Sequence, residues 1–350
     1  MRKETYQKLE EYSKNLAETF GVSEHSISRG HEFTVEPSMR QKLEDAVQLN
    51  SDFLSQINVV PVDEMKGETL MLGVTSSIAG RVDTDKNARQ GIGFTGLTSH
   101  SYECKNVQYD TALPYVQLDM WAKFPDFANR IANQKIKRIA LDRIMIGFNG
   151  TSAAKETNRE ENPLLQDVNI GWLENVRQNA ADHVLKTAKL VKGSQDALAK
   201  YKLKANEYKT LDALVNEAKY NVIAEEFRDD TELVVLLGSD LMFSNYAPYQ
   251  NEIKPTEKVA GDVIMAQKRI GGLKAVTVPF FPKNALLITR LDNLSLYYQA
   301  DSTRRKWLDD AQRDRYLDLL SNNECYVVEN YKAVAFVENI TTLELPDSEK

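Results

Sequence analysis

Three glycines, Gly91, Gly93 and Gly96, are spaced as in the GxGxxG motif of dinucleotide-binding proteins, so phosphate recognition is the first chemistry to consider. The motif works only between a strand and a helix, because the pyrophosphate rests on N–H groups at the start of that helix. Here a polar run precedes it and SHSYECK follows it, which favours a flexible loop. The segment 233–240, LVVLLGSD, resembles a phosphate-binding turn but lacks the rest of a phosphate loop. It is more typical of a buried strand followed by a helix cap.

Histidine and cysteine form no recognisable catalytic or metal-binding motif. The four histidines lie far apart in polar contexts, and none has the partner four residues away that suits a helical zinc site. Cys104 and Cys325 lie outside any nucleophile motif, and two cysteines cannot build a disulfide framework. We therefore expect no catalytic residue, no cofactor and no metal. An intracellular α+β enzyme with a dispersed active site remains an alternative.

Two groups of charged residues are dense enough to form contact surfaces. The first is a basic face on a predicted helix, with Arg130, Lys135, Lys137, Arg138 and Arg143. It could contact phosphates with a modest, salt-sensitive affinity, although a solvated face or an ion-pair surface between subunits explains it equally well. The second group, in 301–318, balances both signs and indicates either a polar interface between like subunits or an exposed helix. Its members include Asp301, Arg304, Arg305, Lys306, Asp309, Asp310, Arg313 and Arg315.

The composition excludes several classes of protein. The chain has 350 residues, 42% of them hydrophobic and 27% charged, with a formal net charge of −7. These values are typical of a soluble globular protein of about two domains, and they exclude a strongly basic nucleic-acid binder. The charged N-terminus lacks the apolar core of a signal peptide, and no apolar run approaches the roughly 18 residues of a membrane span. We expect a protein of a reducing, cytosolic compartment with no membrane partner.

The elements that position these residues begin with a predicted amphipathic helix over 1–20, which Gly21 ends. A polar segment, expected to be flexible and exposed, follows it, and helical spacing returns between Met39 and Ile57. This pattern indicates an arm. Residues 67–116 then predict a long two-stranded projection with a loose tip. Because such a hairpin is marginally stable alone in water, it should lie on another molecule, which would bury apolar groups such as Leu70, Leu72 and Tyr109.

The remaining sequence predicts an α+β block. A long helix spans 125–149, with Pro125 in its first turn and Asn149-Gly150 as a left-handed stop. Weaker helices are expected within 162–177 and 180–205, and Thr210 should cap a further amphipathic helix. Beyond it the apolar period changes to that of strands, at 233–237, 275–279, 285–289 and 294–298, with a last strand pair after residue 320.

Longer segments resemble the major capsid proteins of peduovirus-type temperate tailed phages. The resemblance covers nearly the whole chain and is far more specific than any short motif. It is carried by FTVEPS (33–38), SDFLSQINVVPVDEMKGE (51–68), LDMWAKFPDF (118–127), IALDRIMIGFNG (139–150), NPLLQDVNIGW (162–172) and AQKRIGGLKAVTVPFFPKNALLITRLDNLSLYY (266–298).

The resemblance implies the capsid fold of tailed phages and herpesviruses, the HK-ninety-seven type, which combines an N-terminal arm, an extended loop, a peripheral domain on a long spine helix and an axial domain. The implied boundaries are 1–50 for the arm, 51–116 for the extended loop region, 117–204 for the peripheral domain, 205–320 for the axial domain and 321–350 for a return to the peripheral domain and a C-terminal tail.

The implied function is self-assembly into pentamers and hexamers of an icosahedral head around double-stranded DNA, with weak interior contact to that DNA. A scaffolding or protease protein and a portal protein are implied partners, and the shell would assemble in the host cytoplasm and end in the virion. We also expect maturation to remove residues 1–32, between Glu32 and Phe33. An encapsulin-like nanocompartment with a protein cargo is the alternative shell.

Overall fold

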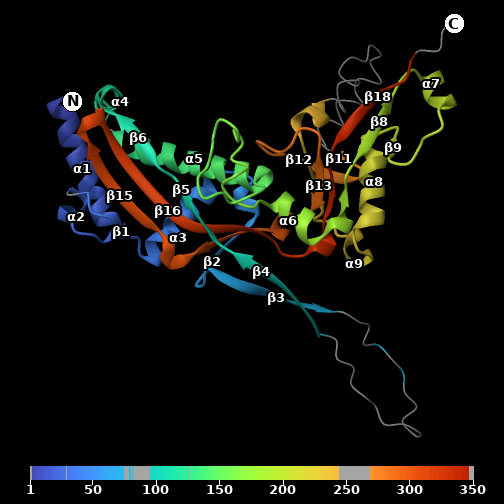
Figure 1. Cartoon of the computed structure of the whole chain (residues 1–350), viewed down its shortest axis with the longest axis horizontal. Helices are drawn as coiled ribbons and strands as arrows, with labels where there is room; N and C mark the ends of the chain where they lie inside the picture. Colours follow the sequence, from blue (N-terminus) through green and yellow to red (C-terminus); the bar gives the residue numbers. More distant parts are fainter. Residues whose placement is uncertain are drawn as a thin grey trace.

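The protein is elongated, and residues 3–20 and 340–344 lie at opposite ends of the longest axis (Figure 1). The computed structural model describes residues 2–28, 30–74, 79, 81, 95–124, 126–243 and 269–346. Helices and sheets alternate along this part of the chain, in agreement with the predicted α+β class.

A seven-stranded sheet forms the N-terminal lobe. Strand β16 is its centre, because β15 and β14 pair with one edge of it and β6 and β5 with the other, while β1 and β2 form the outer strands. In the first ten residues of β16 every second side chain is buried, as expected of a strand with one covered face. The strands are β1 (Phe33–Thr34), β2 (Asn58–Val62), β5 (Lys105–Gln108), β6 (Thr111–Pro114), β14 (Leu294–Gln299), β15 (Arg304–Asp310) and β16 (Arg315–Val328).

The predicted long helix is α5 (Phe127–Asn149), and it packs on the covered face of β16. Its end differs from the prediction, because Gly150 has φ −63° and is not left-handed. Glycine is required there for another reason: a Cβ at Gly150 would lie 2.1 Å from the carbonyl oxygen of Asn169. The position therefore serves close backbone approach and not a left-handed cap.

The N-terminal helices pack on one end of α5. Helix α1 (Lys3–Phe20) ends at Gly21, which has φ 65°, so this part of the prediction is confirmed. The prediction of a flexible, exposed segment after it is only partly right: Glu24, His25 and His31 are exposed, but α2 (Glu24–Ser28) forms there and the Ile27 side chain is buried. Apolar residues of α1 and α2 share one core with α4 (Tyr115–Trp121), the start of α5 and the β15–β16 hairpin. Helix α3 (Pro37–Leu49) continues along the sheet.

The C-terminal lobe contains a mixed six-stranded sheet whose order is β11-β12-β10-β13-β17-β7. Helix α8 (Leu211–Val222) packs against it, and Thr210 caps this helix as predicted, with its Oγ1 accepting from the Ala213 N–H at 3.2 Å. The strands are β7 (Val184–Leu185), β10 (Val234–Leu237), β11 (Arg269–Ile270), β12 (Leu273–Thr277), β13 (Leu286–Thr289) and β17 (Ala335–Val337). The apolar runs read as strands are thus confirmed.

A small three-stranded sheet lies beside this lobe, with β8 (Ala188–Lys192) between β9 (Glu207–Tyr208) and β18 (Ile340–Glu344). Short helices α6 (Trp172–Asn179), α7 (Gln195–Lys200) and α9 (Glu225–Arg228) complete the described α-helices. The prediction of weak helices within 162–177 and 180–205 is therefore only partly correct. Residues 162–170 form no helix, and 188–192 form strand β8, which pairs in parallel with β18.

The two lobes are built from interleaved parts of the chain. Strands β14 to β16 belong to the N-terminal lobe, whereas β17 returns to the six-stranded sheet. This topology differs from the expected boundaries, since residue 320 lies inside β16 and the final strands join the C-terminal lobe.

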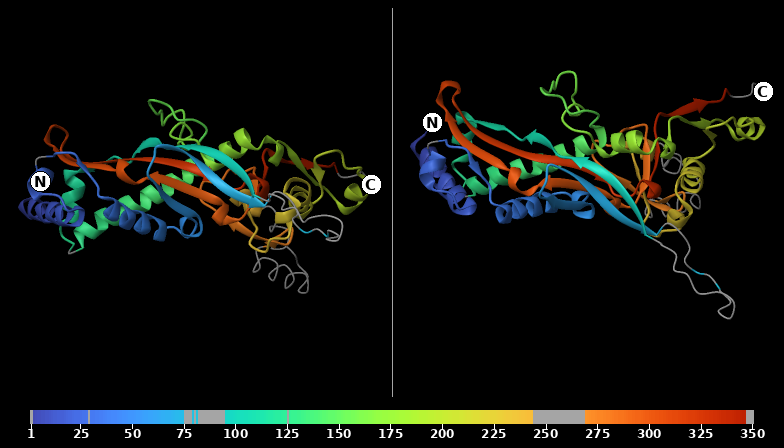
Figure 2. Two further views of the ribbon diagram at one scale, coloured as in Figure 1. Left: turned by 90° about the horizontal axis from the view of Figure 1, so that it is seen from below. Right: turned by 60° about the horizontal axis from the view of Figure 1, so that its bottom comes forward.

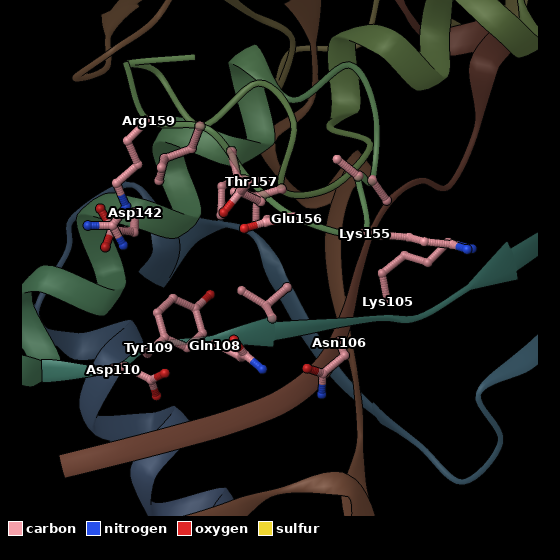
Figure 3. A pocket seen from close by; sticks show the side chains of 16 residues that line it. Lys105, Asn106, Gln108, Tyr109, Asp110, Asp142, Lys155, Glu156, Thr157 and Arg159 are labelled. Atoms are coloured by element: carbon pink, nitrogen blue, oxygen red, sulfur yellow. The ribbon is translucent and has the colours of Figure 1, made fainter. Parts of the chain in front are cut away.

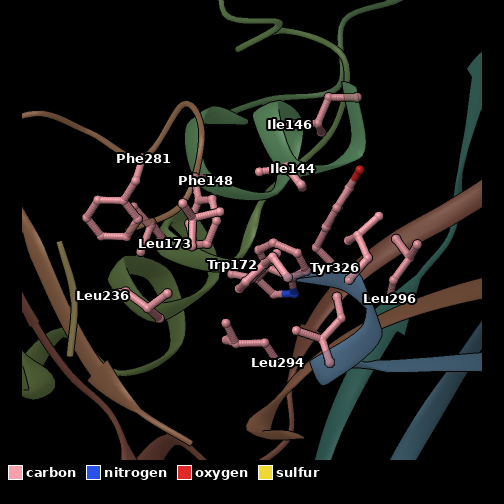
Figure 4. Packing of buried hydrophobic residues seen from close by; sticks show 14 of the residues in the cluster. Ile144, Ile146, Phe148, Trp172, Leu173, Leu236, Phe281, Leu294, Leu296 and Tyr326 are labelled. Carbon is pink, nitrogen blue, oxygen red and sulfur yellow. The ribbon is translucent and has the colours of Figure 1, made fainter. Parts of the chain in front are cut away.

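The interface between the lobes is a continuous apolar core around Trp172 (Figure 4). The Trp172 ring makes edge contacts with Phe53, Phe148 and Tyr326, at centroid distances of 5.1 to 5.9 Å. Its Nε1–H donates to the Ser295 carbonyl at 2.9 Å. Leu236 of β10 belongs to the same core, so the core joins the seven-stranded sheet to the six-stranded sheet.

Candidate functional site

A two-stranded hairpin projects from the body (Figures 1 and 2). It consists of β3 (Lys66–Val74) and β4 (Thr95–Glu103), paired in register from Lys66 with Glu103 to Val74 with Thr95. Within the described residues these strands pair only with each other, so each has one edge with unpaired backbone groups. Such edges readily accept another strand or chain. The hairpin is therefore the feature best placed to contact another molecule.

The predicted two-stranded projection is confirmed, but it is shorter than the predicted 67–116, because β5 and β6 pair with β16 in the body. The expected extended loop region, 51–116, also includes β2, which pairs with β14 in the body. The expectation that another molecule buries Tyr109 is wrong, because its side chain is buried within the chain and its hydroxyl donates to Glu324 Oε2 at 2.9 Å. The side chains of Leu70 and Leu72 lie outside the described part.

Of the GxGxxG motif, Gly91 and Gly93 also lie outside the described residues. Gly96 lies in β4, so a strand occupies the place where a dinucleotide site needs a helix.

The base of the hairpin is fastened to the body by polar and aromatic contacts. Glu103 accepts ion pairs from Lys66 at 2.9 Å and from Lys105 at 2.7 Å. These pairs lower the pKa of Glu103. Next to this cluster, the ring of Tyr102 in β4 contacts the ring of Tyr297 in β14 edge to face, with a centroid distance of 5.3 Å. The direction of the hairpin is consequently set where it leaves the sheet.

A buried charge seam joins the spine helix α5 to β16 and α3. We use this name for Arg40 and Glu44 of α3, Lys135 and Arg143 of α5, Arg305 of β15, and Asp318 and Glu324 of β16, all of them buried. Arg143 donates to Glu44 Oε1 at 2.9 Å and also binds Glu324. Although burial by itself raises the pKa of Glu44, the Arg143 and Arg40 guanidiniums lower it, so this carboxylate is ionised.

At the other end of the seam, Asp318 receives two bonds from Arg305, at 2.8 and 2.9 Å, and an ion pair from Lys135 at 3.0 Å. Burial opposes its charge, yet these two cations lower the pKa of Asp318 to about 2. Burial also lowers the pKa of Lys135 to about 8. Because a buried charge without its partner is costly, the seam fixes the position of α5 along the sheet.

The pKa of Asp318 makes a testable link between pH and stability. It is depressed below the unfolded value of about 3.9, so the carboxylate stabilises the fold above pH 4 and this stabilisation is lost as pH falls towards 2. Its contribution is on the order of 2 kcal/mol. The variant Asp318→Asn should be less stable near neutral pH and should show a shallower loss of stability between pH 4 and 2 in urea unfolding. Asp301→Asn, at an exposed position, should keep the original slope, and an unchanged slope for Asp318→Asn contradicts this assignment.

The predicted basic helix face is wrong for two of its five residues. Lys135 and Arg143 point into the seam, while Arg130, Lys137 and Arg138 are exposed. Arg130 and Arg138 each form an ion pair with a carboxylate four residues away, Asp126 at 2.8 Å and Asp142 at 2.6 Å. The sequence spacing does indicate that these two residues are buried. Lys135 and Arg143 lie four residues beyond the apolar Ile131 and Ile139, on the same face of the helix.

The charged segment 301–318 is mainly a β-hairpin, so the alternative of an exposed helix is wrong. Arg305 lies in the seam. Arg313 and Arg315 pair with Asp310, at 3.6 and 2.9 Å, and Tyr115 donates to Asp309. Asp301 and Arg304 are exposed and Lys306 is half-buried. Much of the charge balance noticed in the sequence is therefore satisfied within one chain.

The peptide bond expected to be cleaved, between Glu32 and Phe33, lies just before β1. Glu32 is exposed, and its carboxylate is 3.8 Å from Arg304. Phe33 is half-buried and pairs with Arg305 at the edge of the seven-stranded sheet. Only two residues pair in β1, so this edge is short.

A polar cavity of about 540 Å³ lies between β5, α5 and the loop 151–170 (Figure 3). Lys105, Lys155 and Arg159 line it together with Asp110, Asp142 and Glu156, three charges of each sign. This lining selects no ligand charge. Among the described residues no group of three His, Cys, Asp or Glu side chains could hold a metal ion. The described helices include none that is long and apolar enough to cross a membrane.

Comparison with solved structures identifies the fold. The chain superposes on a protein of the "Satellite phage P4 procapsid including size determination (Sid) protein" with a TM-score of 0.77, at 41% identity, over 98% of this chain and 99% of that one. It also matches the "Capsid of empty GTA particle computed with C5 symmetry", with a TM-score of 0.50 at 11% identity, over 83% of this chain and 90% of that one. The fold, with its projecting hairpin and spine helix, is that of a tailed-phage capsid subunit.

Sequence comparison narrows the class. The family model "Phage major capsid protein, P2 family" matches residues 8–340. "Capsid proteins" of Escherichia phage P2 are 44% identical over 342 residues, which is 97% of this chain and 95% of that protein. The "Major capsid protein" of Serratia phage KSP20 is 35% identical over 341 residues, covering 96% and 97% respectively. The chain belongs to the P2 family of phage major capsid proteins.

Membership in this family confirms the resemblance seen in the sequence, together with the capsid fold of the HK-ninety-seven type. The protein is a structural component of the virion that forms the capsid shell, and it is not an enzyme. The encapsulin-like and enzymatic alternatives are not favoured by these comparisons.

Proposed function

We propose that copies of the chain form pentamers and hexamers in which the β3–β4 hairpin of each subunit lies across its neighbour. The observation that carries this proposal is the pair of unpaired hairpin edges that extend from the body. The C-terminal lobe, with its six-stranded sheet, would be the axial domain around the capsomer axis. The N-terminal lobe, with α5, would be the peripheral domain.

The energetics favour this arrangement. A two-stranded hairpin is at best marginally stable in water, and it gains order when another surface covers it. Stable subunit contacts bury about 1,600 Å² or more. We expect the projecting hairpin and the exposed charged turn at 311–314 to contribute to this area together. The residues with exposed charge in the 301–318 segment, chiefly Asp301, Arg304 and Arg313, are then candidates for contacts between subunits.

A reconstruction of purified particles tests this arrangement. We expect β3 and β4 of one subunit to lie on the adjacent subunit of the same or a neighbouring capsomer, with five- and six-fold capsomers in one shell. A hairpin folded back on its own subunit would contradict the proposal.

We also propose that the shell encloses double-stranded DNA with only weak contact. The net charge of −7 disfavours tight binding of a polyanion. Of the predicted basic face, only Arg130, Lys137 and Arg138 are exposed, and two of these are paired with carboxylates. A scaffolding or protease protein and a portal protein complete the proposed partners, with assembly in the host cytoplasm.

The third part of the proposal is removal of residues 1–32 during maturation. The exposure of Glu32 and the short pairing of β1 support cleavage between Glu32 and Phe33. Loss of α1 and α2 would uncover Trp307 and Tyr316, which these helices bury. The intact mass of the protein from mature particles should correspond to a chain that begins at Phe33. A mature chain that retains residues 1–32 would refute this part.

A further inference from the structure

The two cysteines of the chain lie side by side at the base of the hairpin. Cys104 follows β4 and precedes β5, and Cys325 lies in β16. Both thiols are buried, and their sulfur atoms are 3.3 Å apart. They are 221 positions apart in sequence, so the fold alone brings them together.

The strand register places them in a geometry that a disulfide can adopt. Lys105 pairs with Glu324 in the antiparallel ladder between β5 and β16, and the next position in the same register sets Cys104 opposite Cys325. Five pairs along the same ladder, Tyr109 lies opposite Leu320. The Tyr109 N–H donates to the Leu320 carbonyl, which marks a hydrogen-bonded pair. Because the two kinds of pair alternate, the cysteines occupy a non-hydrogen-bonded position, where the Cα atoms are closest and the side chains are nearest. The sulfurs must approach by little more than 1 Å to reach a bond length of about 2.05 Å.

We propose that Cys104 and Cys325 are a disulfide site that stays reduced during synthesis and closes on oxidation by a peroxide, fastening the base of the β3–β4 hairpin to β16. Their surroundings suit an intrachain link, because Val60, Tyr297 and Val327 pack around the two sulfurs and keep other large thiols away. A virion leaves a reducing cytosol for oxidising surroundings. The expectation that the two thiols are oxidised at this stage therefore rests on the proposed function. The disulfide chemistry itself does not depend on it.

The reaction balances with hydrogen peroxide as the oxidant. The hydrogen bond between the two thiols lowers the pKa of Cys104, which makes its sulfur the better nucleophile. The Cys104 sulfur attacks one peroxide oxygen and the O–O bond breaks. Hydroxide is the leaving group, and Cys104 becomes a sulfenic acid. The Cys325 sulfur then attacks the Cys104 sulfur, the S–O bond breaks and a second hydroxide leaves. The two thiol protons convert the two hydroxides into water, so two thiols and one peroxide give one disulfide and two waters.

The test uses the full chain, purified with a reductant and then treated with hydrogen peroxide. We expect the intact mass to fall by two hydrogen atoms, and a protease digest to contain one peptide pair that joins Cys104 to Cys325 and separates on reduction. Cys104→Ser and Cys325→Ser should each show neither change. Two alkylatable thiols in the unfolded protein after treatment, sulfinic acids in place of the link, or disulfide-linked dimers on a non-reducing gel would each overturn the site.

The restraint is tested separately, by hydrogen exchange of the same oxidised chain. Amides of Lys105–Gln108 should exchange at least about tenfold more slowly than in the reduced chain, because opening of β5 from β16 is then restricted. In Cys104→Ser the peroxide should not change their exchange. A linked chain with unaltered exchange at these amides would overturn the role as a fastening while the linkage itself stands. Both readouts apply to unassembled subunits, so failure of shell assembly leaves this test intact.

Discussion

A chain in which Asn-Gly replaces residues 70–99 is expected to fold as a soluble subunit and to form no closed shells. Thr69 and His100 are paired across β3 and β4, so a two-residue turn can connect them directly. The two main hydrophobic cores lie in the body and are untouched. What disappears is the outer part of the projecting hairpin, while the pairs from Lys66 with Glu103 to Thr69 with His100 remain. Electron microscopy and sedimentation should therefore show single subunits or small oligomers where the full chain gives shells.

A second truncation keeps this prediction testable. Replacing residues 73–96 with Asn-Gly joins the paired positions Leu72 and Leu97 and leaves a longer stem. Circular dichroism and urea unfolding of both truncated chains should match those of the full subunit, which shows that the body is folded. Normal closed shells from a chain without residues 70–99 would contradict the role of the hairpin.

The variant Arg143→Met should lose about 3–5 kcal/mol of unfolding free energy, because it leaves Glu44 and Glu324 buried without their main cation. The side chain of Arg143 is only 2% exposed, so water cannot replace the lost partner. Against the total stability of 5–15 kcal/mol typical of a domain, this loss is large. Urea unfolding is best measured in the chain without residues 70–99, where assembly does not add to stability.

Arg138→Met is the matched control, since Arg138 lies on the same helix at 57% exposure with one carboxylate partner, Asp142. Its ion pair is at the surface, and its removal should cost about 0.5 kcal/mol or less. Equal losses for the two variants would show that the seam does not hold α5. A second variant, Arg143→Met with Glu324→Gln, should recover part of the loss because one unpaired charge is then neutral.

The sequence predicts the regular elements well where one local pattern decides them. The steps of three and four in 1–20, the cap at Thr210 and the apolar strand runs depend on local periodicity, and all three are confirmed. The length of α5 follows from the same kind of pattern. The projecting hairpin is predicted because its polar segment is too long for a structureless loop in a compact domain.

The sequence does not predict the buried charge seam, because its ion pairs join residues far apart in the chain. Arg143 and Glu324 are separated by 181 positions, and a lone cation on a helix is more often solvated than buried. Two local signals could have indicated it. One is the four-residue spacing of Lys135 and Arg143 with apolar residues, and the other is the two-residue spacing of Asp318, Asn322 and Glu324 with Tyr316 and Leu320 on β16. The contact between the cysteines likewise needs the register of β5 on β16, which no local pattern specifies.

Electron microscopy of the full-length protein purified from expressing cells tests the central claim most directly. We expect closed, roughly spherical shells whose particle mass is that of many copies of the 39.7 kDa chain. A homogeneous population of single subunits, with no shells at any protein concentration, would contradict the account.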